Sequence, residues 1–161
     1  MMDFEIPADI QDTLEQLDAF IDAEIKPLEQ QDDNIRFFDH RREWARTDFD
    51  NDCVPRADWE ELLREMRRRA DAAGWLRLAL PSEFGGQDAS NLKMAIIREH
   101  LAHKGLGLHN DLQNESSIVG NFPFVNMFEH FGTEAQKAEF IPGGFERTRI
   151  VAFGLTEPDH G

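Results

Sequence analysis

Apolar residues recur at spacings of three and four over much of the first 141 residues, with polar residues between them. The first such run extends from about residue 8 to residue 30, and acidic side chains occupy the positions between its apolar residues. This period predicts an amphipathic α-helix, which Pro27 should kink or end near the last turn. Its predicted apolar face consists of Ile10, Leu14, Leu17, Ile21, Ile25 and Leu28.

Further segments show the same helical period or a clear helix start. Glycine follows three of them, at Gly74, Gly105 and Gly132, as expected where a helix ends. Asp58 is a plausible N-cap for the first of these, and Thr133 with Gln136 fits a capping box for the last. The predicted helices cover about residues 55–73, 90–103, 116–131 and 134–140.

Several faces and stops follow from this assignment. Helix 90–103 should present Leu92, Ala95, Ile96, Leu101 and Ala102 as its apolar side. Pro123 should distort the early turns of helix 116–131, and the Pro-Gly-Gly sequence at 142–144 should end the last helix.

Residues 29–56 have no sustained period and predict a long loop, with room for one short helix. A loop of this length in a compact domain is often functional or covered by a partner, and the alternative is an insertion specific to a subgroup.

The last segment differs from everything before it. Residues 150–153 are a short, apolar, partly β-branched run that predicts a buried strand. A lone strand cannot satisfy its own backbone groups, so it needs partner strands that these residues do not supply. We therefore expect a mainly α fold: a helical domain over residues 1–148, followed at 149–161 by the first strand and turn of a β-domain.

Composition narrows the function classes. The sequence has 32 Asp and Glu against 17 Lys and Arg, a formal net charge of −15, which argues against nucleic acid and anionic membranes as partners. One cysteine, Cys53, excludes a disulfide framework. The first residues resemble neither a secretory signal nor a transit peptide, and no apolar run approaches ~18 residues. These features predict a cytoplasmic protein without a membrane span.

The candidate chemistry is sparse. His100, His103, His109 and Asp111 invite a metal site, but the Glu-x-x-His spacing of a di-iron bundle is missing, so these histidines are better explained as core-edge or surface groups. The arginines at 64 and 67–69 are better explained as a solvated face paired with neighbouring glutamates.

The strand end offers more donors. The Leu155 and Thr156 amides, the Thr156 hydroxyl and a nearby glycine lie within a few residues, as at a ligand site. A strand followed by a proline-initiated turn is the alternative.

Three ordered motifs carry a resemblance to the acyl-CoA dehydrogenases. Phe153-Gly-Leu-Thr156-Glu157-Pro158-Asp-His-Gly161 resembles the first signature of that family, in which a similar Thr-Glu-Pro run is followed by Gly-Ser-Asp. Leu80-Pro81-Ser-Glu-Phe-Gly85-Gly86 is similar to the loop after the family's second helix. Phe131-Gly132-Thr133-Glu-Ala-Gln136-Lys137 is similar to its Gly-Thr-x-x-Gln-Lys helix start. The resemblance covers the chain from about residue 10 to its end.

The resemblance implies an N-terminal helical domain, a middle β-domain and a C-terminal helical bundle. It also implies FAD, an acyl-CoA substrate, an electron-transfer flavoprotein or similar acceptor, and a homo-oligomer. In the implied reaction, a carboxylate base removes the α-proton of the thioester and the β-hydride passes to the flavin.

The same resemblance assigns residues. Phe153, Leu155 and Thr156 would lie along the flavin, with the Thr156 hydroxyl facing its pyrimidine edge, and Gly161 would approach the pyrophosphate. The resemblance also implies that the family's fourth helix lines the acyl cavity with Glu115, Ser116 and Val119, although ordinary packing explains these residues equally well.

Departures from the family pattern limit these expectations. The family's catalytic glutamate belongs to its C-terminal region, so Glu157 is not assigned that role, and we expect a fragment that is inactive by itself. Asp159-His160 replaces smaller residues, and a long loop at 37–52 points to a subgroup that handles longer or unusual acyl chains.

Two alternatives stay open. One is an acyl-CoA oxidase-like flavoenzyme of the same fold, and the other is a non-catalytic helical interaction module.

Overall fold

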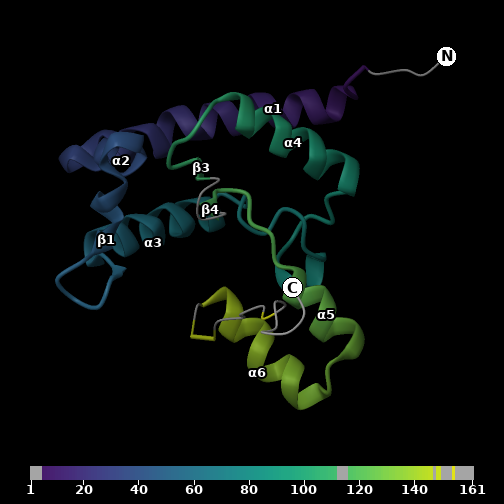
Figure 1. The fold of residues 1–161 in the computed structure, drawn as a ribbon. Coiled ribbons are helices and arrows are strands. Elements are labelled where there is room, and N and C mark those ends of the chain that lie inside the picture. Colours follow the sequence, from purple (N-terminus) through teal and green to yellow (C-terminus); the bar gives the residue numbers. More distant parts are fainter. Residues whose placement is uncertain (1–4, 112–115, 147, 150–153, 155–161) are drawn as a thin grey trace, which may run out of the picture. The chain divides into compact units, whose positions relative to one another are not determined.

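The computed structural model describes residues 5–111, 116–146, 148–149 and 154. It consists mainly of α-helices with two short antiparallel hairpins, which confirms the mainly α fold (Figure 1). Two compact units comprise residues 1–121 and 122–161. The predicted strand at 150–153 lies outside the described residues, and the boundary at 148/149 stays a prediction. No helix among the described residues is long and apolar enough to cross a membrane.

The first predicted helix is a continuous helical run in three parts. These are α1 (Ala8–Phe20), the π-helical turn η1 (Ile21–Ile25) and α2 (Lys26–Gln30). In the π turn the Lys26 amide donates to the Ile21 carbonyl, five residues back, and Pro27 stands in the first turn of α2, where a missing N–H costs little. The predicted kink is thus a widened turn just before Pro27.

The segment predicted as a long loop is folded, so that prediction was wrong. It contains the 3₁₀ helices η2 (Gln31–Phe38) and η3 (His40–Arg46) and a hairpin of β1 (Thr47–Asp48) and β2 (Val54–Pro55). Phe37 is buried against Trp59 of the next helix, with ring centroids 5.1 Å apart. The sequence of this segment shows no sustained hydrophobic period because short 3₁₀ turns and two-residue strands are too brief to establish one.

Helix α3 (Ala57–Ala72) corresponds to the helix predicted at about residues 55–73 and buries one of its own faces. It ends just before Gly74, which has a φ of 82°. Its N-cap is Arg56, so the assignment of Asp58 as cap was wrong: Asp58 lies in the first turn and takes two ion pairs there. The buried residues of α3 are Trp59, Leu62, Leu63, Met66 and Ala70.

An apolar link leads from α3 through the short helix η4 (Ser82–Phe84) to α4 (Asn91–His103). Helix α4 packs on α1, and its predicted apolar face was partly wrong, because it buries Ile97 and Leu101 while Leu92 is exposed. Asp18 of α1 contacts His100 at 2.7 Å and Lys104 at 2.8 Å, which joins the polar edges of the two helices.

The predicted helix at 116–131 was wrong in its first half. Residues 116–117 form strand β4 (Ser116–Ser117), which pairs with β3 (Asn110–Asp111), and helix α5 runs only from Pro123 to Phe131. The Ile118 amide donates to His109 and the Gly120 amide to Leu76, so neither is available to a helix. Pro123 begins α5 because a proline disfavours helical geometry in the residue before it.

The second unit contains α5 and α6 (Glu134–Phe145). Thr133 and Gln136 form the predicted capping box, with both reciprocal bonds present. The predicted stop at 142–144 was wrong, because α6 continues to Phe145. Gly144 is required inside this helix, since an added Cβ would overlap the ring of Phe124.

Candidate functional site

The residues assigned from the terminal signature, Phe153, Leu155, Thr156 and Gly161, lie outside the described residues, as does Glu115. Ser116 lies in strand β4 and Val119 is fully buried just beyond it. Neither residue is in a helix, so the expected placement on a fourth helix was wrong. Their proposed contact with an acyl chain stays a prediction.

The β3–β4 hairpin next to these residues is unusual in its polarity. The buried polar or charged residues among those described all lie in it or directly before it: His109, Asn110, Asp111 and Ser117. The Ser117 hydroxyl donates to the His109 carbonyl and accepts from the Val119 amide at 3.2 Å. Burying polar groups costs free energy unless they are paired. Their concentration here makes this hairpin the strongest candidate for a polar binding site among the described residues.

Arg46 of η3 supplies the largest of these pairings. Its Nη1 donates to Asp111 Oδ2 at 2.7 Å, and the two side chains are 10 % and 1 % exposed. Its Nε donates to the Phe37 carbonyl at 2.6 Å, and its guanidinium lies 4.6 Å from the Trp59 ring centroid. The arginine therefore joins the hairpin to η2 and α3, so this ion pair fixes where β3 lies.

His109 lies beside the carboxylate of Glu29, the residue before the last of α2. Glu29 Oε2 accepts from the Leu108 amide at 2.5 Å, and a Cβ added to Gly107 would lie 2.8 Å both from that oxygen and from His109 Nδ1. His109 Nε2 is buried and has no hydrogen-bond partner among the described residues. Burial lowers the pKa of His109, and Lys104 lowers it further, although Glu29 opposes this shift. The imidazole is therefore held neutral, with one ring nitrogen available to a ligand or a water.

This arrangement predicts a pH dependence of stability. The unfolded chain takes up a proton near the ordinary histidine pKa of 6.5, whereas the folded chain resists protonation, so protons favour the unfolded state. We expect the free energy of unfolding to fall as pH drops below about 6.5, by at most about 1.4 kcal/mol per pH unit for one proton. Urea unfolding at pH 7.5 and pH 5.5 measures this difference.

The matched variants for that measurement are His109→Gln and His103→Gln, the second at an exposed position. The first should lose less stability on acidification than the wild type, and the second should behave like the wild type. Equal acid sensitivity of His109→Gln and the wild type would contradict a neutral, buried imidazole.

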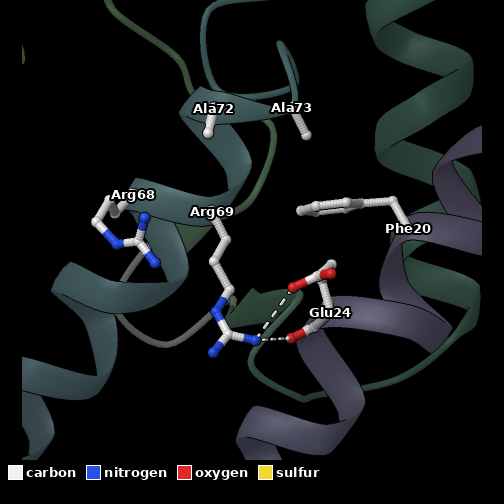
Figure 2. A pocket seen from close by; sticks show the side chains of 6 residues that line it. All are labelled: Phe20, Glu24, Arg68, Arg69, Ala72 and Ala73. Carbon is white, nitrogen blue, oxygen red and sulfur yellow. Dashed lines mark hydrogen bonds and ion pairs between the residues drawn. The ribbon is translucent and has the colours of Figure 1, made fainter.

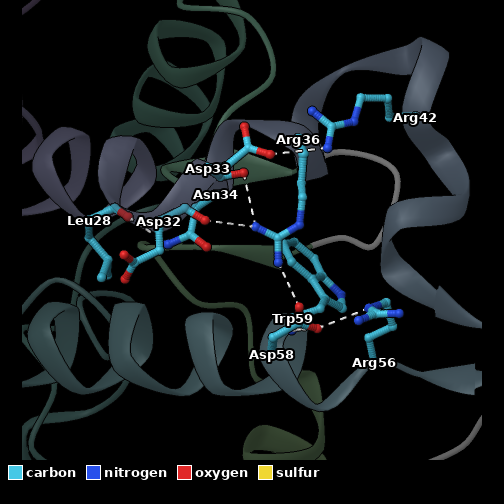
Figure 3. A network of polar contacts seen from close by, with 9 residues as sticks. All are labelled: Leu28, Asp32, Asp33, Asn34, Arg36, Arg42, Arg56, Asp58 and Trp59. Atoms are coloured by element: carbon cyan, nitrogen blue, oxygen red, sulfur yellow. Dashed lines mark hydrogen bonds and ion pairs between the residues drawn. The ribbon is translucent and has the colours of Figure 1, made fainter.

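Arg36 organises a second polar network, between η2 and α3 (Figure 3). It donates to the Asp32 and Asp33 carbonyls and, at 2.6 Å, to Asp58 Oδ2. Asp32 and Asp33 have positive φ values of 49° and 59°, so these carbonyl bonds hold a turn that aspartate tolerates but does not favour. Although burial raises it, hydrogen bonds from Arg36 and Arg56 keep the pKa of Asp58 below its ordinary value.

A hollow of about 540 Å³ lies between α1, η1 and α3 (Figure 2). The ring of Phe20 and the small Ala72 and Ala73 border it, together with Glu24, Arg68 and Arg69. Arg69 contacts Glu24 at 3.2 Å, and hydrogen bonds from Arg68 and then Arg69 lower the pKa of Glu65 to about 2. Both arginines are thus paired with carboxylates, as predicted for Arg68 and Arg69, and the hollow has little net charge to attract an anion.

No group of three or more His, Cys, Asp or Glu side chains is placed to hold a metal ion in the part of the chain that the structure describes. His100 Nε2 lies 2.7 Å from Asp18 Oδ1, and His103 is exposed. Sequence reasoning singled out His109 and Asp111 as possible metal ligands and missed Arg46 and Glu29. Only their positions in the fold distinguish Arg46 and Glu29 from the many other charged residues of the chain.

Comparison with known proteins identifies the family. Residues 32–146 match the model of the acyl-CoA dehydrogenase N-terminal domain. The chain belongs to the acyl-CoA dehydrogenase family. The matched range includes the motifs at 80–86 and 131–137 and the folded segment at 32–56.

Curated relatives of this acyl-CoA dehydrogenase N-terminal region agree. The chain is 30 % identical over 110 residues to acyl-CoA dehydrogenase FadE12 of Mycobacterium tuberculosis, covering 67 % of this chain and 26 % of that protein. It is 30 % identical over 126 residues to the mitochondrial very long-chain specific acyl-CoA dehydrogenase of Rattus norvegicus, covering 78 % and 17 %. It is 25 % identical over 162 aligned positions to glutaryl-CoA dehydrogenase of Desulfococcus multivorans, covering 99 % and 34 %.

The chain therefore spans about a quarter of the length of the first curated relatives that it matches. No solved structure matches it.

Proposed function

We propose that the protein is an FAD-dependent acyl-CoA dehydrogenase that introduces an α,β double bond into an acyl-CoA thioester. The observation that carries this proposal is the family match over residues 32–146. The relatives named above support it, because each is described as an acyl-CoA or glutaryl-CoA dehydrogenase. The proposal concerns the full-length protein, of which these residues would form the N-terminal domain.

FAD, when bound, would supply the acceptor for the β-hydride. The residues proposed to contact it are Phe153, Leu155, Thr156 and Gly161. The Thr156 hydroxyl and the neighbouring amides would donate hydrogen bonds where negative charge develops. Family membership supports these roles, and residues 155–161 lie outside the described part of the chain.

The acyl chain would contact Glu115, Ser116 and Val119. Support comes from the buried position of Val119 beside a hairpin of buried polar groups. That hairpin would keep the nearby chain in place through Arg46 and Asp111 rather than take part in proton transfer. The carboxylate base would come from outside residues 1–161, so the described region would bind and orient without catalysing by itself.

The remaining expectations are part of the same proposal. The electron acceptor would be an electron-transfer flavoprotein or a similar carrier, the assembly a homo-oligomer, and the location the cytoplasm. Family membership supports the acceptor, and the single cysteine is compatible with a reducing compartment. An acyl-CoA oxidase-like enzyme would differ by reacting rapidly with oxygen after reduction, and a non-catalytic module would bind no flavin.

The first test is Thr156→Val in the full-length protein. Losing one hydrogen bond to a charged acceptor costs about 1.5–3 kcal/mol, so we expect flavin reduction by acyl-CoA to slow by about tenfold or more, or FAD affinity to fall as much. Flavin absorbance, followed anaerobically while acyl-CoA thioesters of graded length are added, measures both quantities.

Thr13→Val is the matched control, since Thr13 lies in α1 and its hydroxyl donates to the Asp9 carbonyl, one turn back, at 2.8 Å. It should leave flavin binding and reduction unchanged. Wild-type protein that contains FAD but is not reduced by any thioester would overturn the proposed reaction. Thr156→Val with wild-type affinity and rate would overturn only the assignment of that residue.

A further inference from the structure

A carboxylate from another helix holds the linker that leads from α4 to β3, residues 104–109 (Figure 1). Glu29 of α2 accepts from the Leu108 amide at 2.5 Å, although the two residues are 79 positions apart in the sequence. Leu108 is 1 % exposed and His109 is 8 % exposed, and residues 1–161 alone bury them to this extent. The contact is therefore interior, and it does not depend on what else covers this region.

Gly107 brings the Glu29 carboxylate and the His109 imidazole to one place. A Cβ added to Gly107 would lie 2.8 Å from Glu29 Oε2 and 2.8 Å from His109 Nδ1. Glycine is required here, because any side chain would displace one of those two groups. The linker consequently cannot move away from α2 without separating all three residues.

The two ends of the linker are held differently. At one end, the His109 carbonyl accepts from the Ile118 amide at 3.1 Å and from the Ser117 hydroxyl at 3.4 Å. At the other end, Gly105 has a φ of 82°, and no described atom lies within 4 Å of a Cβ added there. Hinges are formed by a few such residues, at the ends of elements, that can absorb a change in φ and ψ. Gly105 is therefore the point about which the linker can turn.

The imidazole of His109 is the unsatisfied group in this packing. Its Nε2 is buried and has no hydrogen-bond partner among the described residues. Burial lowers the pKa of His109, and it outweighs the opposing effect of Glu29. The carbonyls of Leu101 and Gly105 also oppose it, whereas Lys104 adds to it. A proton therefore binds more tightly once the ring has left its site and reached water.

Other charged groups around the linker are already paired. Lys104 contacts Asp18 of α1 at 2.8 Å, and Asp111 of β3 contacts Arg46 at 2.7 Å. Carboxylates and lysines ordinarily titrate near about 4 and about 10.4, whereas histidine titrates near about 6.5. Between pH 7.5 and pH 5.5, the group in this region that responds to acid is therefore the imidazole of His109.

We propose that Glu29 and His109 form an acid-sensitive latch, which keeps the linker closed against α2 at neutral pH and releases it when His109 takes up a proton from solvent. The closed linker holds the neutral ring and the open linker holds the protonated one, so acid shifts the population toward the open form. Release breaks the bond between Glu29 and the Leu108 amide. The hairpin stays attached through Arg46 and Asp111, so the opening is confined to the linker. The proposal does not depend on the reaction proposed above.

Hydrogen exchange of the full-length protein, followed by mass spectrometry, tests the latch in a peptide that spans residues 104–111. The open linker takes up a proton at the ordinary histidine pKa, so opening should be about tenfold more frequent at pH 5.5 than at pH 7.5 once intrinsic exchange rates are divided out. Low concentrations of urea should leave this exchange unchanged while they speed exchange in α1, because a local opening exposes little surface. A linker that responds to urea as α1 does, or that does not respond to pH, would overturn the proposal.

Two variants assign the effect to the two residues. His109→Gln should remove the dependence on pH, whereas His103→Gln, at an exposed position, should keep it. Glu29→Gln retains an acceptor oxygen but loses the charge, so protection of the linker should fall about fivefold at pH 7.5 while the response to acid remains. Glu15→Gln, at an exposed position of α1, is its control and should change neither quantity. Acid sensitivity that persists in His109→Gln, or a linker as well protected in Glu29→Gln as in Glu15→Gln, would contradict the latch.

Discussion

Arg46→Met is expected to lower the free energy of unfolding by about 3–5 kcal/mol. The substitution removes the guanidinium, which lies over the Trp59 ring and is the 2.7 Å ion-pair partner of the almost fully buried Asp111 carboxylate. The Phe37 carbonyl also loses its donor. Since natural domains are stable by only about 5–15 kcal/mol, the variant should be partly unfolded near physiological temperature. Urea unfolding followed by circular dichroism measures the change.

Two comparisons separate the loss of the buried pair from a general effect of removing an arginine. Arg42→Met breaks the pair with Asp33, whose side chains are 36 % and 60 % exposed, and should cost less than about 1 kcal/mol. Arg46→Met/Asp111→Leu removes both charges and should be more stable than Arg46→Met alone, because the buried Asp111 charge is then removed together with the arginine that faces it. A cost below about 1 kcal/mol for Arg46→Met, or a double variant less stable than the single one, would contradict the argument.

The parts of the fold that the sequence predicts well are those where one local pattern decides the structure. Helix α1 and its continuation bury Ile10, Leu17, Ile21, Ile25 and Leu28, all on the predicted face. The capping box forms because its two members, Thr133 and Gln136, are only three residues apart in the sequence. In such segments, periodicity and side-chain chemistry point to the same answer.

The failures occur where distant contacts override local pattern. Residues 116–122 have helical spacing, but the Gly120 amide bonds to Leu76 and the Ile118 amide to His109, so tertiary partners take the donors that a helix needs. Helix α6 passes through Pro142, and the ring of Phe124 in α5 approaches Gly144 so closely that an added Cβ would overlap it. Local sequence patterns predict neither of these tertiary contacts.

The candidate site shows the same limit more strongly. Arg46 and Asp111 are 65 residues apart, and nothing near either one predicts that they meet. The signature at 153–161 resembles that of the family because its residue pattern is local, but its geometry lies outside the described residues. Sequence motifs therefore indicated the family, whereas the hairpin of buried polar residues could be found only from the structure.

Gly86 illustrates how the structure supplies the reason behind a motif. The sequence predicts only a turn at Gly85-Gly86, and Gly85 does have a left-handed φ of 77°. Gly86 is required for another reason, because an added Cβ would overlap the carbonyl carbon and oxygen of Leu80 and lie 2.7 Å from its Cβ. The backbone folds back so tightly that the Asp88 amide reaches the Leu80 carbonyl at 3.0 Å.

Gly86→Ala should therefore destabilise the protein by about 3 kcal/mol or more, as expected for overpacking against backbone that cannot move without losing hydrogen bonds. Thermal unfolding followed by circular dichroism measures the change. Gly105→Ala is the matched control: its φ is 82°, but no atom lies within 4 Å of an added Cβ, so it should cost only about 1–2 kcal/mol through backbone conformation alone. If the two variants were equally stable, the loop at 81–89 would have to yield freely. The hydrogen bonds from the Gln87 and Ala89 amides to the Leu78 carbonyl would then contribute little to holding the turn against the chain that precedes it.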